Sequence, residues 1–451
     1  MKTSTFLAAV TALAGTAAAE SMAKLRELKI DTWAHQHEAG AYDVDRYQAT
    51  AATKCVNGKA GEYQCSNVDL KGFLRHQDMG SSTRKGNDIW GWTAPNGREF
   101  ATVGQTDGTA FVELLSDGSL VYLGRLPTQT TSSSWRDMKV IGNHVYIGSE
   151  ASNHGLQVFD LTKLLDIDPS SPKVFSTSSD LTAIYKGFGS SHNIVAHEET
   201  NMIYAVGTAA SAGCRGGLFM VNVTNPASPV KAGCLSAGGY VHDAQCVIYK
   251  GPDTRYTGKE ICFNFNEDTL DIVDVTSKSS PKTLSSKTYN GASYTHQGWL
   301  VDSSMKYLLL DDELDEYYGN GKASNKKTTT YIVDISSLTA PTFAGIYQSP
   351  ATSIDHNQYV VKGLSYQSNY GSGLRIVDVS SIPSKPDGSG LKQVGFFDCY
   401  PEDDSYGGRA EFTGSWSVYP FFKSGYLLLN SIERGVFSLK YTGAGAAFAS
   451  E

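Results

Sequence analysis

The chain has 451 residues, a formal net charge of -8 and only 19% charged residues, together with 45 glycines and 25 tyrosines. This acidic balance argues against a nucleic-acid partner or an anionic membrane surface. No stretch reaches the roughly 18 apolar residues of a membrane-spanning helix. A composition rich in glycine and tyrosine and poor in charge is typical of a turn-rich, all-β protein.

The first residues have the pattern of a secretory signal peptide. A lysine precedes an apolar run over Phe6–Ala14, and the small residues Ala17–Ala19 offer a cleavage site before Glu20. We therefore expect residues 1–19 to be removed and the mature protein to be secreted, extracellular and monomeric. Residues 20–66 are expected to form a short N-terminal arm.

A short apolar motif that contains one acidic or polar residue recurs seven times. The clear copies are Leu156–Leu161, Leu270–Val275, Tyr331–Ile335 and Leu374–Val379, and the looser ones are Phe111–Leu114, Met220–Val223 and Val436–Leu439. The acidic or polar member stands at positions 113, 160, 222, 274, 334, 378 and 438, a spacing of 44 to 62 residues. This period suits one four-stranded sheet per repeat, so the sequence predicts a seven-bladed β-propeller.

Each repeat contains four predicted strands, ordered from the inside of the ring outward. In the second repeat these are Met138–Ile141, Val145–Gly148, Leu156–Leu161 and Lys173–Ser176. The last repeat lacks a fourth strand, because only small residues follow Val436–Leu439. The segment Asn67–Leu74 resembles the outer strands of other repeats, and we expect it to pair with the last sheet and close the ring. The predicted propeller covers residues 67–441, and 442–451 form a flexible tail.

Seven cysteines agree with export to an oxidising compartment. The strand registers and spacings favour three disulfides, Cys55–Cys65, Cys214–Cys234 and Cys246–Cys262. The first would staple the N-terminal arm, and the others would join neighbouring strands within one blade. Cys399 is left over and is expected to be a buried free thiol.

Four consecutive repeats begin their inner strand with a histidine. These residues are His192, His242, His296 and His356. The flanking repeats place Trp135 and Trp416 at the same position. Because the inner strands of a propeller start at one mouth of the central channel, we expect all six side chains to converge there. The loops between the second and third strands emerge on the same face and bring Glu150 and the acidic run 311–316.

The order and number of these motifs resemble the secreted choice-of-anchor B family, whose sheets carry LVIVD-type repeats. The matching stretches include Cys55–Leu70, Asn87–Trp92, Ser134–Lys139, Ser191–Val195, Tyr240–Val247, Tyr294–Leu300, Asp311–Glu316, Asp355–Tyr359 and Gly414–Pro420. The resemblance runs from about Cys55 to Leu439. It implies the propeller fold and an extracellular location, and it implies no settled activity.

Three interpretations of the histidines remain open. In one, each histidine bonds a neighbouring carbonyl or carboxylate and holds adjacent sheets together. In another, the imidazoles bind a transition metal, with Asp243 or Glu150 as a further ligand or hydrogen-bond partner. In the third, the mouth is a metal-free ligand pocket. Its candidate lining residues are Trp135, Arg136, Asp137, Glu150 and Trp416.

Two other charged motifs have alternative roles. Asp311, Asp312 and Glu313 offer the hard oxygen ligands that calcium prefers, although such a run is more often a solvated loop. Arg136 and Asp137 would either clamp a substrate carboxylate or bridge two sheets, and bridging is favoured.

The sequence therefore predicts a secreted propeller that binds a small polar ligand or a divalent metal ion at a mouth of histidines, carboxylates and aromatic rings. One alternative is a metal-dependent extracellular enzyme of the glycan lyase or hydrolase type. Another is a protein-interaction propeller with structural histidines. The partner classes are an extracellular small molecule, a glycan or a protein. No motif of a catalytic nucleophile is present, so no catalytic residue is assigned.

Overall fold

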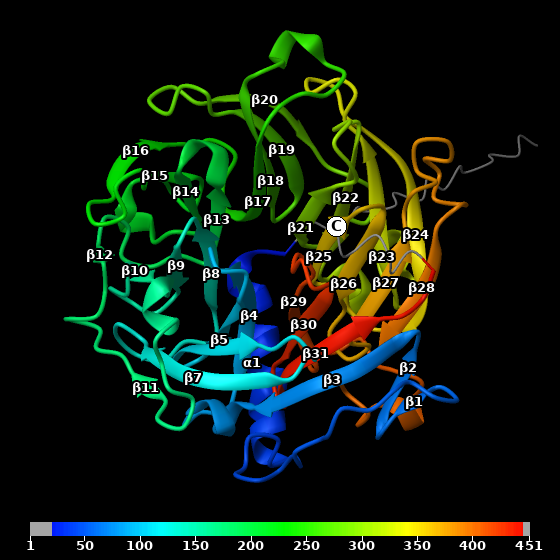
Figure 1. Cartoon of the computed structure of the whole chain (residues 1–451). Coiled ribbons are helices and arrows are strands. Elements are labelled where there is room, and N and C mark those ends of the chain that lie inside the picture. Colours follow the sequence, from blue (N-terminus) through cyan, green and yellow to red (C-terminus); the bar gives the residue numbers. More distant parts are fainter. Residues whose placement is uncertain (1–19, 445–451) are drawn as a thin grey trace, which may run out of the picture.

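Seven mainly antiparallel sheets surround a central axis in the computed structural model, which describes residues 20–444 (Figure 1). The predicted signal peptide lies outside the described residues, as does most of the predicted tail. The inner strands contact one another in a closed circle, in the order β4, β8, β13, β17, β21, β25, β29 and back to β4. The protein is thus a seven-bladed β-propeller, as the repeat spacing predicts.

The first four blades follow the chain in order. Blade one is β4 (Gly86–Thr93), β5 (Glu99–Gln105), β6 (Gly108–Leu114) and β7 (Leu120–Pro127); blade two is β8 (Arg136–Ile141), β9 (His144–Ser149), β10 (Leu156–Asp160) and β12 (Ala183–Tyr185). Blade three is β13 (Asn193–His197), β14 (Met202–Val206), β15 (Phe219–Asn222) and β16 (Val230–Cys234); blade four is β17 (Val241–Ile248), β18 (Glu260–Asn266), β19 (Thr269–Asp274) and β20 (Lys282–Lys287).

Of the remaining three blades, the last two incorporate strands from the N-terminal segment. Blade five is β21 (Thr295–Leu300), β22 (Tyr307–Asp312), β23 (Lys327–Asp334) and β24 (Thr342–Thr352). Blade six is β25 (Asn357–Val361), β26 (Leu364–Ser368), β27 (Leu374–Asp378) and β28 (Lys392–Phe397), extended by β2 (Tyr63–Ser66) and β1 (Lys59–Ala60). Blade seven is β29 (Ser415–Tyr419), β30 (Tyr426–Ser431), β31 (Gly435–Tyr441) and β3 (Val68–Arg75).

Ring closure by the N-terminal segment is confirmed. Strand β3 pairs antiparallel with β31, with Leu70 opposite Leu439 and Phe73 opposite Phe437. The pairing covers the edge that blade seven would otherwise expose. One strand assignment is wrong, because the fourth strand of blade two is β12 rather than Lys173–Ser176. Strand β11 (Lys173–Val174) instead pairs in parallel with β7 of blade one.

The repeated motif lies in the third strand of each blade, and in blades two, four, five and six its aspartate ends that strand. The apolar positions of β10, β19, β23 and β27 are buried between neighbouring blades. The carboxylates of Asp160, Asp274, Asp334 and Asp378 accept the backbone N–H two residues further on, at 2.8–3.0 Å. This local hydrogen bond forms the turn that leads out of the strand, which explains why one acidic residue recurs at this position.

Three disulfides connect cysteines close in the chain, in the pairings that the sequence favours. They are Cys55–Cys65, Cys214–Cys234 and Cys246–Cys262, with Cα–Cα distances of 5.9, 5.6 and 4.0 Å. Cys399 is a buried free thiol.

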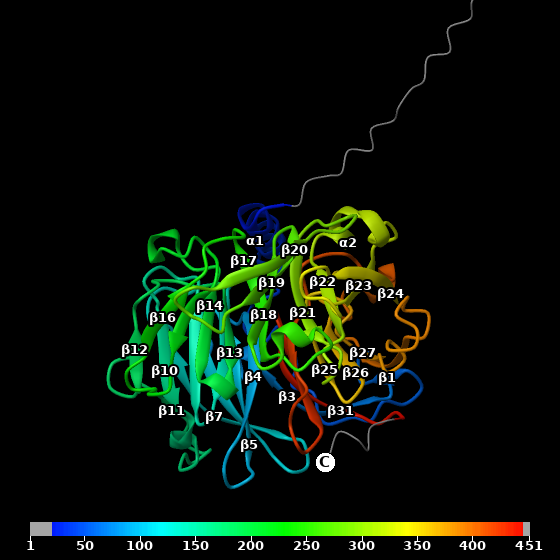
Figure 2. The same cartoon turned by 90° about the horizontal axis from the view of Figure 1, so that it is seen from above.

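A helix not predicted from the sequence lies across one face of the ring. Helix α1 (Met22–Glu38) begins at Ser21, whose hydroxyl accepts the N–H of Lys24 and caps the first turn. Its buried side chains are Met22, Leu25, Lys29 and Trp33, which the helical period places on one side. Figure 2 shows α1 on the same face as the short helix α2 (Asp315–Tyr318). Within residues 20–444 no helix has the length and apolar character needed to cross a membrane.

Candidate functional site

The four histidines form a continuous arc at one mouth of the channel. The ring centroids of His192 and His242 lie 4.2 Å apart, those of His242 and His296 4.0 Å, and those of His296 and His356 4.4 Å. All four side chains are buried. The ring of Trp416 continues the arc at 5.0 Å from His356. The convergence expected from strand topology therefore occurs.

Helix α1 covers this mouth. The indole of Trp33 lies between Trp135 and Trp416, at centroid distances of 5.4 and 6.1 Å, and its Nε1 donates to the carbonyl of Phe412. Arg26 forms an ion pair with Glu150 at 2.8 Å. Trp135, Trp416 and Glu150 thus hold the protein's own N-terminal helix, and the histidine arc lies beneath it.

Glu313 is the carboxylate at the centre of the covered mouth. Its side chain is fully buried and forms an ion pair with Nζ of Lys29 at 2.6 Å. The hydroxyl of Tyr370 donates to the same carboxylate at 2.5 Å. Nε2 of His296 lies 3.4 Å away and Nε2 of His356 lies 3.6 Å away. A single carboxylate therefore meets one ammonium, one phenol and two imidazoles.

Hydrogen bonds at Nδ1 determine the tautomer of His242 and His356, and therefore which ring nitrogen carries a lone pair. Nδ1 of His242 lies 2.9 Å from the carbonyl of His296, and Nδ1 of His356 lies 2.5 Å from the carbonyl of Trp416. A carbonyl can only accept, so each Nδ1 carries the proton and each neutral ring presents a lone pair at Nε2. Among the described residues, Nε2 of His242 and Nε2 of His296 have no hydrogen-bond partner.

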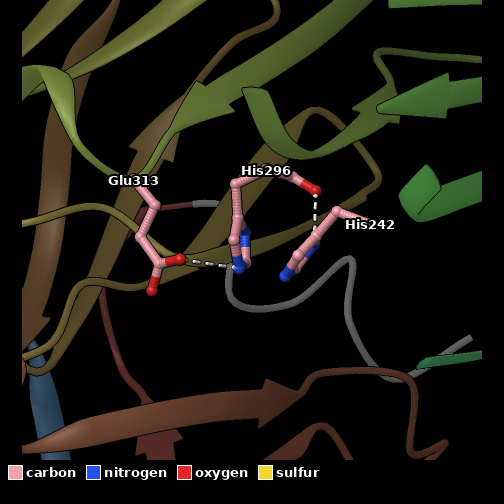
Figure 3. A group of neighbouring side chains, drawn as sticks. All are labelled: His242, His296 and Glu313. Atoms are coloured by element: carbon pink, nitrogen blue, oxygen red, sulfur yellow. Dashed lines mark hydrogen bonds and ion pairs between the residues drawn. The ribbon is translucent and has the colours of Figure 1, made fainter. Parts of the chain in front are cut away.

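Three of these side chains are close enough to share one ion (Figure 3). One ligand atom each of His242, His296 and Glu313 lies within 4.8 Å of the other two, and no other such group occurs in residues 20–444. Two of the four predicted histidines belong to it. His192 instead bonds Glu150 through Nδ1 at 2.7 Å.

Burial keeps the imidazoles neutral. It lowers the pKa of His242, His296 and His356 well below the ordinary value, and the neighbouring Lys29 adds to this effect. Burial also lowers the pKa of Lys29, although Glu313 acts in the opposite direction. Neutral imidazole is the form that coordinates metals.

A small cavity lies beneath the arc. Its volume of about 10 Å³ is close to the minimum that one water molecule needs. Asp137 and Asp243 line it, but neither belongs to the three-residue group. Asp137 is engaged by Lys139 at 2.5 Å and by the N–H of Ile194. Burial raises the pKa of Asp243 to about 7.

Arg136 bridges sheets rather than reaching the mouth. Its fully buried guanidinium donates from Nε to the carbonyl of Gln105 in blade one and from Nη1 to Nε2 of His154 in blade two. The structure thus agrees with the bridging interpretation of this residue, and a carboxylate clamp formed by Arg136 receives no support.

The acidic run 311–316 is buried, so its interpretation as a solvated loop is wrong. Asp312 accepts five bonds from Ser293, Tyr294, Leu314, Asp315 and Tyr289. Asp311 accepts from Gln358 at 2.7 Å, and Glu313 turns to the histidines. Asp311, Asp312 and Glu313 therefore have separate partners, and this geometry does not support a shared calcium ion.

Two residues of the site gave no usable sequence signal. Lys29 lies in a segment without repeats, and a lysine on a helix is normally solvated. Tyr370 lies in the loop between β26 and β27 of blade six, and its hydroxyl donates to Glu313, which follows β22 of blade five. Each contact joins positions far apart in the chain, which no local pattern reveals.

A comparison with protein-family models identifies one repeat in the chain. A family model described as the LVIVD repeat matches residues 328–349, in blade five. This match supports a repeat-containing propeller, but it does not show that the chain belongs to the choice-of-anchor B family. No curated protein matches the chain.

Solved structures with similar coordinates share little sequence. They include a protein from Lactobacillus plantarum (TM-score 0.48, 12% identity, 77% of this chain and 89% of the other), Kuenenia stuttgartiensis hydrazine synthase (0.48, 11%, 77% and 94%) and the Cps50 (Swd1) β-propeller domain of Myceliophteria thermophila (0.43, 11%, 79% and 96%). These similarities carry no conclusion about activity.

Proposed function

We propose that this propeller is a secreted protein of the choice-of-anchor B family that binds one divalent transition-metal ion in its central channel. The ligands are Nε2 of His242, Nε2 of His296 and the carboxylate of Glu313. The observation that carries the proposal is that one ligand atom from each of these three residues lies within 4.8 Å of the other two, and that Nε2 of both histidines has no hydrogen-bond partner among the described residues. Secretion is supported by the signal-peptide pattern and the three disulfides.

The chemistry of the ligands favours a transition metal over calcium. Two imidazoles and one carboxylate suit Zn²⁺, Co²⁺, Fe²⁺ or Mn²⁺, whereas calcium takes six to eight oxygen ligands. The hydrogen bond from Nδ1 of His242 to the carbonyl of His296 orients the ring as metal-binding histidines require.

The electrostatics of the site require one cation next to Glu313, and Lys29 is that cation in this structure. The lone pair of His356 Nε2 lies 3.6 Å from the carboxylate of Glu313, and that pair is repulsive unless a positive charge lies close by. Nζ of Lys29 supplies such a charge at 2.6 Å from Glu313. A metal ion would take over this role, so its binding requires Lys29 to move away or to lose its proton.

The space around the histidines is too small for a glycan. His242 and His296 line a cavity of about 10 Å³, which Glu313 does not line, and α1 closes the mouth above it. A glycan lyase or hydrolase would need an open cleft at the histidines. With α1 in place, binding of an ion is the function that this geometry supports best.

Metal analysis tests the proposal. Protein stripped with a chelator is titrated at pH 7 with Zn²⁺ or Co²⁺, and Co²⁺ coordination is followed by visible absorption. Wild type is expected to bind one equivalent, and the double variant His242→Ala/His296→Ala none. The matched control is His35→Ala/His37→Ala, two exposed histidines of α1. Absence of binding by wild type, or equal binding by the site variant, would overturn the proposal.

If wild type binds no metal, the sheet-bridging role becomes the better account. His242 Nδ1 bonds a carbonyl of blade five and His356 Nδ1 a carbonyl of blade seven, so each ring already links two blades. In that case His242→Ala should lower the free energy of unfolding by about 1–2 kcal/mol.

A further inference from the structure

A larger groove opens beside α1, separate from the histidine cavity. Its volume is about 850 Å³, within the range of small-molecule sites. Arg26 of α1 lines one side, and the loops of blades one to four line the rest, with Trp135, Thr208, Arg215 and Tyr240 among them. Serine and threonine side chains make up much of the remaining wall.

Four lining residues carry a buried polar atom without a hydrogen-bond partner among the described residues. These atoms are Nε of Arg26, Nε1 of Trp135, Oγ1 of Thr208 and the hydroxyl of Tyr240. The side chains of Trp135 and Thr208 are more than nine-tenths buried. The two nitrogens can only donate, and the two hydroxyls can also donate. A ligand that satisfies this wall must therefore bring hydrogen-bond acceptors.

The charge of the groove adds a second requirement. Glu150 is the carboxylate among its lining residues, and both of its oxygens are engaged, by Arg26 at 2.8 Å and by His192 at 2.7 Å. Arg215 is exposed and forms no ion pair or hydrogen bond within the part of the chain that the structure describes. The groove thus has one cation in excess, which favours an anionic ligand.

We propose that this groove binds an acidic carbohydrate, with the carboxylate or sulfate of the sugar at Arg215 and its hydroxyl and ring oxygens at Trp135, Thr208 and Tyr240. Such a ligand is rich in acceptors, carries the negative charge that the wall lacks, and at the size of a disaccharide fits the volume. The binding does not depend on the proposed metal ion, because none of the three metal ligands lines the groove.

Ligand binding is measured by calorimetry and by ligand-observed NMR with purified residues 20–451. The probes are a uronic-acid disaccharide, a sulfated disaccharide and the matching neutral disaccharide. The acidic probes are expected to bind at least tenfold more tightly than the neutral one, and the better of the two identifies carboxylate or sulfate as the preferred group. Equal affinity for the neutral probe, or no binding of either acidic probe at millimolar concentration, overturns the proposal.

Variants place the binding in the groove. Arg215→Gln is expected to weaken the acidic probe about tenfold, and Thr208→Val to weaken it to a smaller extent. The matched control is Lys282→Gln, which removes an exposed charge from β20 on blade four. Arg215 has no partner to lose, so its variant folds as wild type does, which circular dichroism and melting verify. Unchanged affinity in Arg215→Gln, or an equal loss in Lys282→Gln, contradicts the assignment.

Discussion

Two buried glutamates have the same kinds of neighbours, but they differ in how many of the polar atoms around them have hydrogen-bond partners. Glu260 in β18 and Glu313 after β22 each contact a lysine, a tyrosine and histidine. Around Glu260, Nζ of Lys278 lies at 2.5 Å, Nδ1 of His197 at 2.7 Å, and the hydroxyl of Tyr204 also donates. These groups come from blades three and four, and none of their atoms is among the buried polar atoms of residues 20–444 that lack a hydrogen-bond partner.

Glu313 differs in the source and the geometry of its partners. Its lysine, Lys29, comes from α1 rather than from a sheet, and its histidines lie at 3.4 and 3.6 Å without hydrogen-bond geometry. Nζ of Lys29, Oε2 of Glu313 and Nε2 of His296 all lack a hydrogen bond among the described residues. A satisfied buried cluster stabilises a fold, whereas an unsatisfied one calls for a missing partner. The comparison separates a structural bridge from a candidate binding site.

The largest expected effect comes from breaking the satisfied cluster. Glu260→Gln leaves the partly buried Lys278 without its counter-charge and the buried His197 without its carboxylate partner, so we expect the free energy of unfolding to fall by about 3 kcal/mol. Denaturant unfolding followed by tryptophan fluorescence measures this loss. Metal binding should stay as in wild type, because Glu260 is not part of the three-residue group. A loss below about 1 kcal/mol would contradict the view of Glu260 as a bridge.

The corresponding change at Glu313 should cost less stability. Glu313→Gln removes the partner of Lys29, but α1 can carry this lysine into solvent, so we expect a loss of about 1–2 kcal/mol. The main result should be faster hydrogen exchange and proteolysis of α1, with the sheets unaffected. The matched control is Glu27→Gln, an exposed carboxylate of the same helix. Unchanged protection of α1 would show that Lys29 does not hold the helix.

The sequence predicts the seven sheets far better than it predicts helix α1, which covers the mouth of the channel. Seven apolar motifs, each with one acidic or polar residue, specify the blades, because each strand is stabilised by packing against its neighbours in a regular order. The histidine arc follows from the same regularity, since equal positions in successive repeats must meet at one mouth. Strand β12 was missed because the loop before it is long and irregular, and the better β-forming residues Lys173–Ser176 lie outside the blade.

Helix α1 could not be predicted from its own residues. A lysine interrupts its buried stripe of Met22, Leu25 and Trp33, so the apolar pattern is weak. The ion pair of Lys29 in the interior is with Glu313, which lies far away in the chain. For the same reason, nothing in the acidic run distinguished Glu313 from Asp311 and Asp312. Their separate roles depend on neighbours from other blades.

The smallest expected effect is a pH dependence that belongs to the Glu260 cluster. Burial opposes ionisation of this carboxyl, but hydrogen bonds from His197, Lys278 and Tyr204 outweigh it and lower the pKa to about 2. The folded pKa lies below the ordinary value of 4.5, so the cluster contributes stability that is fully present above about pH 4.5. That contribution is lost as the pH falls from about 4.5 towards 2. We expect the difference in unfolding free energy between wild type and Glu260→Gln to stay constant from pH 7 to 5 and to shrink between pH 4.5 and 3. Denaturant unfolding across this range measures it, and a difference that remains constant down to pH 3 would show that the cluster does not hold the carboxyl in its ionised form.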